Sequence, residues 1–193
     1  MKFIGFYSYT VILTYLSLIS GCLGILFSTQ GKLGIAIGCL AFSGLCDIFE
    51  GMVARTKKNR TPDEKNFGIQ IDSLCDVICF GVLPGVYLYF SGLNTPWGIA
   101  IVMFYILCAL IRLAFFNVIE SKRQEKEDGC AKYYRGLPVT TSAIIFPVVF
   151  LIGVPMPDNA LLVTHYILPV IIGFLFIADF RVPKIDISKI FSK

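Results

Sequence analysis

The sequence predicts an all-α fold: a polytopic membrane helix bundle with six transmembrane helices and both termini in the cytoplasm. Three observations carry this prediction: the apolar composition, the length of the apolar stretches and the one-sided distribution of basic residues. Hydrophobic residues make up 56% of the chain and charged residues 16%, and the mean hydropathy is +0.76. Soluble domains are about 45–50% apolar and about a quarter charged, so this composition is typical of a protein whose solvent is largely lipid.

Six apolar stretches are long enough, or nearly long enough, to cross a bilayer. A hydrocarbon core about 30 Å thick requires about 20 residues of helix. In chain order the stretches cover residues 9–29, 33–54, 67–90, 96–119, 138–154 and 160–178. No small-residue cleavage site follows the first stretch, so it is expected to remain as a span.

The breaks between these stretches are short. Polar or turn-forming residues fill three of them, at 30–32, 91–95 and 155–159, and charged residues fill two, at 55–66 and 120–137. Because none of these connections is large enough to form a second domain, residues 1–193 are expected to be one transmembrane domain. A proline inside a span kinks or interrupts the helix. Such prolines are Pro84, Pro147 and Pro169.

Basic residues fix the predicted orientation. Of the 17 Lys and Arg residues, all but Lys32 and Arg112 lie at the N-terminus, in the two charged connections or in the tail after residue 178. Cytoplasmic loops carry the excess of Lys and Arg, so these segments are predicted to face the cytoplasm. The expected location is the cytoplasmic membrane, with any active site in the bundle or at its cytoplasmic mouth.

Several kinds of chemistry are excluded by residue type. The chain has a single histidine, His165, and its seven cysteines include no CxxC pair. A zinc site and a disulfide framework are therefore not expected. The net charge of +4 is modest, and no nucleic-acid partner is expected.

Four acidic residues stand where charge is costly. One carboxylate at mid-bilayer costs about 2.5–3.5 kcal/mol on insertion scales. Asp47 and Glu50 share one face of the second stretch, and Asp72 and Asp76 share one face of the third. Since these two helices are consecutive and antiparallel, all four carboxylates are predicted to converge near the cytoplasmic surface.

Four converging carboxylates cannot all stay ionised without compensation. Hard divalent cations such as Mg²⁺ and Mn²⁺ choose oxygen ligands, and two such ions can clamp the attacking and leaving oxygens of a displacement at phosphorus. Gly51 and Gly68 would leave room for a substrate beside the acids, and Arg55 could neutralise a phosphate. Two other interpretations stay open: interfacial acids paired with loop Lys and Arg, or a proton or cation pathway.

The acidic residues also form a recognisable motif. They read Asp47-Ile-Phe-Glu50-Gly51-Met-Val-Ala54-Arg55, a spacer, and Gly68-Ile-Gln-Ile-Asp72-Ser-Leu-Cys-Asp76. This pattern resembles the signature D-x2-D-G-x2-A-R, spacer, G-x3-D-x3-D of the CDP-alcohol phosphotransferase family, at seven of its eight specified positions. Glu50 stands where the family usually has Asp, and the 12-residue spacer is longer than the usual spacer of about eight.

The resemblance implies roles for these residues. Asp47, Glu50 and Asp72 would bind metal, with Asp76 beside it acting as the general base that deprotonates the acceptor hydroxyl. The residues expected to contact the cytidine and diphosphate of the donor are Gly51, Ala54, Arg55 and Gly68. The cofactor implied is divalent metal, Mg²⁺ or Mn²⁺, as a pair of ions.

Within the family, further stretches resemble the phosphatidylserine synthase branch. They are Phe80-Gly-Val-Leu-Pro84, Arg112-Leu-Ala-Phe-Phe-Asn117 and Arg135-Gly-Leu-Pro138. This branch implies CDP-diacylglycerol as donor, serine as acceptor, CMP as product and a homodimer. A buried Arg needs an anionic partner, so Arg112 is expected to hold the acceptor carboxylate or a donor phosphate, and Asn117 is a weaker candidate for the same task.

Three alternatives remain on sequence grounds. The acceptor could be another alcohol, such as glycerol phosphate or inositol phosphate. A carboxylate-lined transporter is the second alternative, although it would need polar groups through the full depth of the bundle. A catalytically inactive membrane partner is the third, and the departure at Glu50 is the feature that favours it.

Overall fold

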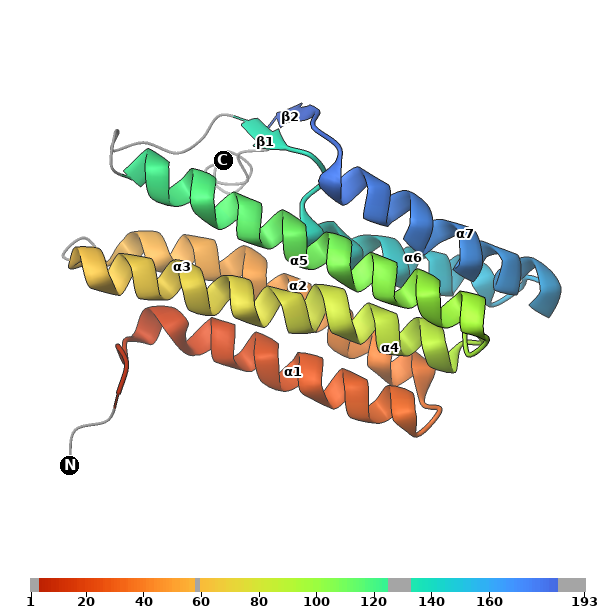
Figure 1. Ribbon diagram of the computed structural model, residues 1–193. Helices are drawn as coiled ribbons and strands as arrows, with labels where there is room; N and C mark the ends of the chain where they lie inside the picture. Colours follow the sequence, from red (N-terminus) through yellow and green to blue (C-terminus); the bar gives the residue numbers. More distant parts are fainter. Residues whose placement is uncertain (1–3, 58–59, 125–132, 184–193) are drawn as a thin grey trace, which may run out of the picture.

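The computed structural model describes residues 4–57, 60–124 and 133–183. Within these ranges the chain is a bundle of helices that lie side by side along one direction (Figure 1). The helices are α1 (Ile12–Thr29), α2 (Leu33–Thr56), α3 (Pro62–Asp76), α4 (Leu83–Phe90), α5 (Pro96–Gln124), α6 (Ser142–Gly153) and α7 (Asp158–Ile177). Short helical turns precede α1 at Tyr9–Val11 and α6 at Val139–Thr141, and a two-stranded ribbon pairs β1 (Tyr133–Arg135) with β2 (Arg181–Pro183).

Five helical segments are long and apolar enough to cross a membrane. They are Tyr9–Thr29, Leu33–Val53, Pro62–Phe90, Pro96–Ser121 and Asn159–Ile177. Their bounds agree with the predicted stretches except at the start of the third. The remaining predicted stretch, 138–154, contains a shorter apolar helix at Val139–Gly153. The helical membrane class is therefore confirmed with five candidate spans.

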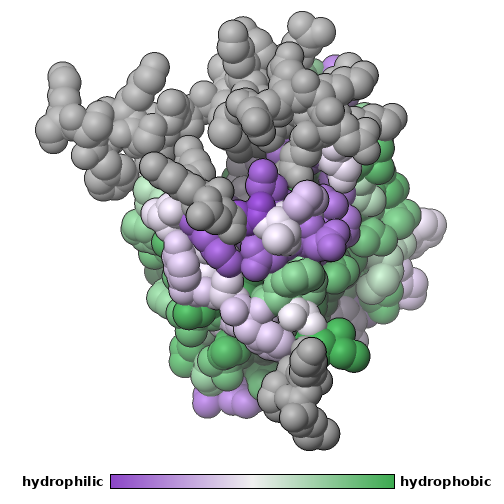
Figure 2. Space-filling view, turned by 90° about the vertical axis from the view of Figure 1, so that its left-hand side faces the viewer, coloured by the Kyte–Doolittle hydropathy of each residue, from purple (hydrophilic) through white to green (hydrophobic). Residues whose placement is uncertain are grey.

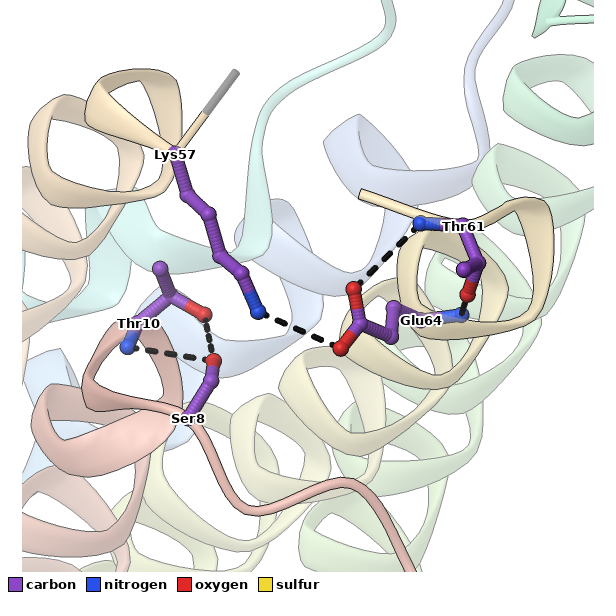
Figure 3. Close-up of polar contacts among 5 residues, drawn as sticks. All are labelled: Ser8, Thr10, Lys57, Thr61 and Glu64. Carbon is purple, nitrogen blue, oxygen red and sulfur yellow. Dashed lines mark hydrogen bonds and ion pairs between the residues drawn. The ribbon is translucent and has the colours of Figure 1, made fainter. Parts of the chain in front are cut away.

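The third span begins five residues earlier than predicted because of a helix cap. The Thr61 hydroxyl accepts a hydrogen bond from the Glu64 amide at 3.2 Å, and the Glu64 carboxylate accepts one from the Thr61 amide at 3.3 Å. Pro62 follows in the first turn, where its missing N–H has no cost. An ion pair of 3.2 Å between Lys57 and Glu64 then ties the end of α2 to the start of α3 (Figure 3). The predicted charged connection 55–66 is thus mostly helix.

The third span is continuous but not regular. Between α3 and α4 the residues Val77–Val82 form a wide π-helical turn, and Pro84 follows in the first turn of α4. Proline removes an amide donor and crowds the preceding turn, and a π-bulge is one way a helix absorbs such a misfit. The predicted interruption at Pro84 therefore takes the form of a widened turn just before it.

The third span is also the centre of the bundle. In the most apolar 18-residue part of this span, 61% of the residues are buried, against 28–39% in the other four spans. Cys79, Phe80 and Leu83 have no exposed surface. Of the two acidic site residues predicted in this span, Asp76 is buried and Asp72 is partly buried.

Buried hydroxyl groups join α1 to α2. Ser17 donates to the Ser43 carbonyl at 3.3 Å and Ser43 donates to the Ser17 carbonyl at 3.0 Å. One turn further along, Ser20 donates to the Cys39 carbonyl at 2.9 Å. Small polar side chains of this kind let membrane helices approach closely and hydrogen-bond across the interface. They set the depth of α2, and hence of Asp47, relative to α1.

The ribbon of β1 and β2 ties the start of the α6 region to the end of α7. Its register pairs Tyr133 with Pro183 and Arg135 with Arg181. Gly136 follows β1 with a φ of +70° and donates its amide to the Phe180 carbonyl at 2.7 Å. A Cβ at Gly136 would lie 2.8 Å from the Ala178 carbonyl oxygen, so only glycine fits this turn.

Replacing either of two glycines of α2 by alanine should have opposite effects on the stability of the protein. A Cβ at Gly44 would collide with the Cβ of Ala143 in α6, whereas a Cβ at Gly38 would meet nothing within 4 Å. We expect Gly44→Ala to destabilise the detergent-solubilised protein by about 1–3 kcal/mol through overpacking. Gly38→Ala is the matched control and should leave the unfolding temperature unchanged or raise it. Equal effects of the two substitutions would contradict the close packing of α2 on α6.

Candidate functional site

Polar side chains gather at one end of the bundle, where α2 ends and α3 begins; we call it the acidic end. Seen from this end, the middle of the surface is hydrophilic and hydrophobic side chains flank it (Figure 2). The starts of α1 and α3 lie at this end, together with the ends of α2 and α5 (Figure 1). The second and third spans are therefore antiparallel, as predicted, and the end of α2 and the start of α3 lie at the same end of the bundle.

Three carboxyl groups meet at the acidic end. One oxygen each of Asp47 on α2 and of Asp72 and Asp76 on α3 lie within 4.8 Å of one another. Asp76 is buried, with 7% of its surface exposed, and the other two are partly buried. We call these three residues the carboxylate trio. Asp72 and Asp76 are one helical turn apart and project from the same face of α3.

Glu50 lies beside the trio and not within it. It is one turn beyond Asp47 on α2, and its carboxyl group is close enough to those of Asp47 and Asp72 to interact electrostatically with both. The hydroxyl group of Thr14 on α1 is another of its neighbours. The four predicted acids thus form a trio with a fourth carboxylate next to it.

The trio fits a divalent cation. Two unit charges 4.8 Å apart repel by about 3.5 kcal/mol at an effective dielectric constant of about 20. Three such pairs would cost about 10 kcal/mol, which is comparable to the whole stability of a typical domain. Mg²⁺ binds oxygens at about 2.0–2.1 Å, so oxygens on opposite sides of one ion are about 4 Å apart. Small side-chain movements would bring the trio to that spacing.

Open space adjoins the trio. A Cβ placed on Gly51 or on Gly68 would meet no other atom within 4 Å. Gly51 follows Glu50 on α2, and Gly68 lies one turn before Asp72 on α3. Both glycines therefore leave room beside the carboxylates, as the sequence predicted. Ala54 and Arg55 continue α2 by one turn, but their side chains lie outside the described part of the structure.

Helix α5 places Arg112 and Asn117, two further predicted site residues, at the depth of the trio. Ser73 of α3 donates to Asn117 of α5 at 2.7 Å, and Tyr105 of α5 donates to the Phe80 carbonyl at 2.8 Å. These two contacts show that α5 runs antiparallel to α3, so Arg112 lies at the level of Asp76. Arg112 is buried, at 6% exposed, and its guanidinium carbon is 5.8 Å from the centre of the Phe116 ring.

Thr14 is a site residue that the sequence analysis did not identify. Cys75 donates its thiol to the Thr14 carbonyl at 3.3 Å, which places Thr14 at the depth of Asp76 along the bundle. The Thr14 side chain is buried, and its hydroxyl makes no hydrogen bond of ordinary geometry within the described residues. The signal in the sequence was a run of small polar residues at helical spacing along the first apolar stretch. These are Thr10, Thr14, Ser17 and Ser20.

Comparison with known protein families agrees with this geometry. The family model for CDP-alcohol phosphatidyltransferase matches residues 9–177, which include every candidate site residue. The chain belongs to this family. The resemblance inferred from the sequence is thereby confirmed, and the chain takes its place among CDP-alcohol phosphatidyltransferases.

Individual relatives narrow the comparison within the family. An archaetidylserine synthase of Methanothermobacter thermautotrophicus is 30% identical over 96% of this chain and 73% of its own length. A CDP-diacylglycerol–serine O-phosphatidyltransferase of Methanocaldococcus jannaschii is 30% identical over 92% of this chain and 74% of its own. One of Saccharomyces cerevisiae is 38% identical, over 51% of this chain and 35% of its own. No solved structure matches the chain.

Metal binding at the trio predicts a change in thermal stability. We expect Mn²⁺ to raise the unfolding temperature of the purified protein, by on the order of 5–10 °C at a concentration 100 times its dissociation constant. Asp47→Asn, Asp72→Asn and Asp76→Asn should each abolish most of this shift. Asp63→Asn is the control, because Asp63 is exposed in the first turn of α3 and is not part of the trio. An undiminished shift in all three trio variants would contradict a metal site at this position.

Proposed function

We propose that this protein transfers the phosphatidyl group of CDP-diacylglycerol to the hydroxyl group of serine and releases CMP. The observation that carries the proposal is the carboxylate trio with open space beside it, in a chain of the CDP-alcohol phosphatidyltransferase family. The acceptor is proposed as serine because the similar archaeal and yeast relatives are an archaetidylserine synthase and CDP-diacylglycerol–serine O-phosphatidyltransferases.

The proposed topology has six spans with both termini in the cytoplasm, in one domain of residues 1–193. The short helix Val139–Gly153 would be the fifth span, since a tight turn joins it to α7 and it packs against α2, while α7 packs against α5. The basic residues favour this orientation because they concentrate at the termini and in the two connections at the acidic end. The site would then face the cytoplasm from the cytoplasmic membrane.

The proposed metal ligands are Asp47, Glu50 and Asp72, with Asp76 completing the set for two Mg²⁺ or Mn²⁺ ions. When bound, such ions would offset the charge of the diphosphate and of the departing phosphate. The site would be partly dry, because Asp76 is buried and Asp47 and Asp72 are partly buried. In such a site each charge interaction is stronger than it would be in water.

Asp76 is the proposed general base. A serine hydroxyl is a weak nucleophile until a positioned base takes its proton. In the proposed step the proton passes to the Asp76 carboxylate, and the serine oxygen forms a bond to the lipid-side phosphorus. The bond from that phosphorus to the bridging oxygen breaks, and CMP leaves with the electron pair. Asp76 suits this role because it is the most buried member of the trio.

Other residues would bind the two substrates. Gly51 and Gly68 leave the space that the diphosphate of the donor would occupy, and Ala54 and Arg55 would contact its cytidine and phosphates. Arg112 would pair with the carboxylate of serine, since it is buried at the level of Asp76. Asn117 would assist from the next turn, held by its hydrogen bond from Ser73. The acyl chains of the donor would stay in lipid.

A transport function has less support. A conducting pathway needs polar groups through the depth of the membrane. The four carboxylates on α2 and α3 instead lie together at the acidic end. We therefore propose the enzyme over the transporter.

Turnover can be tested with purified protein, CDP-diacylglycerol vesicles and Mn²⁺ or Mg²⁺. We expect CMP release with serine to exceed release with glycerol phosphate or inositol phosphate. Removing the base should cost about 10²–10⁴-fold in rate, so Asp76→Asn should be inactive while Asp63→Asn keeps full activity. Failure of the folded protein to release CMP with any acceptor would overturn the proposal in favour of an inactive partner.

The acceptor role of Arg112 can be separated from its packing role. Lysine keeps the charge but not the bidentate geometry of a guanidinium. We expect Arg112→Lys to raise the KM for serine about tenfold or more while the KM for CDP-diacylglycerol changes little. A retained Mn²⁺ thermal shift would show that the variant is folded. An increase confined to the KM of the donor would instead assign Arg112 to the donor phosphate.

A further inference from the structure

The Glu50 carboxylate is harder to hold in one position than the carboxylates of the trio. Glu50 has one more methylene than the aspartate usual at this position of the signature, and so one more side-chain torsion to fix. A carboxylate must be held in one place to serve a metal, and each freely rotating bond costs free energy when it is fixed. The Asp72 carboxyl group also interacts with Glu50, but in the ionised state in which it would bind a metal it carries like charge and repels the Glu50 carboxylate.

A neutral donor lies next to Glu50, the Thr14 hydroxyl on a third helix, α1. Thr14 is 3% exposed, and its β-branched side chain has few rotamers. Its backbone is fixed against α3, because its carbonyl accepts the hydrogen bond from Cys75. A rigid hydroxyl at the depth of the trio is therefore present before any substrate or metal arrives.

The Thr14 hydroxyl differs in its hydrogen bonding from other Ser and Thr hydroxyls in the bundle. In helices, Ser and Thr hydroxyls commonly bond to the carbonyl one turn earlier. Ser28 does so to Gly24 and Thr164 does so to Ala160, both at 2.9 Å. The Thr14 hydroxyl makes no such bond and no other hydrogen bond of ordinary geometry among residues 4–57, 60–124 and 133–183. A buried hydroxyl without a partner costs about 1–3 kcal/mol, so its position favours a partner within the site.

We infer that Thr14 is a positioning residue: its hydroxyl donates to the Glu50 carboxylate and holds this longer side chain in place as a metal ligand. The inference rests on the metal site of the proposed function. According to this inference, helix α1 contributes to a site whose carboxylates come from α2 and α3. Thr14 itself touches neither the metal nor the reacting atoms.

The inference predicts that Thr14 matters only when residue 50 is Glu. Four proteins test it: the wild type, Thr14→Val, Glu50→Asp and the double variant. Valine has the shape of threonine without the hydroxyl. Mn²⁺ affinity is measured by titration, from the thermal shift and from the loss of the free-ion electron paramagnetic resonance signal, so turnover is not required.

We expect Thr14→Val to weaken Mn²⁺ binding about tenfold with Glu50, and less than about twofold with Glu50→Asp, because the shorter carboxylate does not reach Thr14. Thr14→Ser should restore the affinity to near the wild-type value. Thr164→Val is the matched control, since that hydroxyl bonds to its own helix, and it should not change the affinity.

Two results would overturn the inference while leaving the proposed function in place. They are an equal loss of affinity from Thr14→Val in both backgrounds, or no loss with Glu50. Failure of the wild type to bind Mn²⁺ would overturn the metal site of the proposed function, and the inference with it.

Discussion

Mutual repulsion among Asp47, Asp72 and Asp76 is the force that this bundle has to contain. Their oxygens lie within 4.8 Å in a partly buried place, where water screens charge poorly. Left alone, such groups would separate or take up protons. The rest of the structure can be understood as a rigid frame that prevents their separation, so that a cation becomes the favourable way to relieve the repulsion.

This frame consists of hydrogen bonds between uncharged groups. Ser17 and Ser43 brace α1 against α2. Cys75 of α3 and Cys79 of the following π-helical turn donate to the carbonyls of Thr14 and Ser17 and so brace α1 against the third span. Each contact is worth little alone. Together they fix the depths of α1, α2 and α3 relative to one another without adding charge near the trio. Among the described residues, the ion pair Lys57–Glu64 lies at the exposed edge of this frame.

The convergence of the acids was predictable from the sequence because it depends on local rules. A spacing of four residues puts Asp72 and Asp76 on one face, and a connection between consecutive spans makes α2 and α3 antiparallel. The same rules gave the bounds of most spans. They also gave the room beside Gly51 and Gly68.

What the sequence did not predict depends on contacts between distant segments or on exact side-chain geometry. The register of β1 with β2 joins residues about 50 positions apart, and no pattern in either strand specifies its partner. The cap at Thr61 lies within the predicted charged connection, although its sequence Thr61-Pro-Asp-Glu64 fits a capping box. The position of Glu50 outside the trio depends on side-chain geometry that the spacing of the acids does not specify. That the Thr14 hydroxyl is free to donate could not be predicted, because it depends on which buried donors already have hydrogen-bond partners in the folded protein.

The most direct measurement is an anomalous diffraction map of crystals grown with Mn²⁺, recorded at the manganese absorption edge. The account predicts a strong peak between the carboxylates of Asp47, Asp72 and Asp76, bound at normal metal–oxygen distances. A map with well-ordered side chains at these positions and no peak between them, or with the three carboxylates turned away from one another, would contradict it.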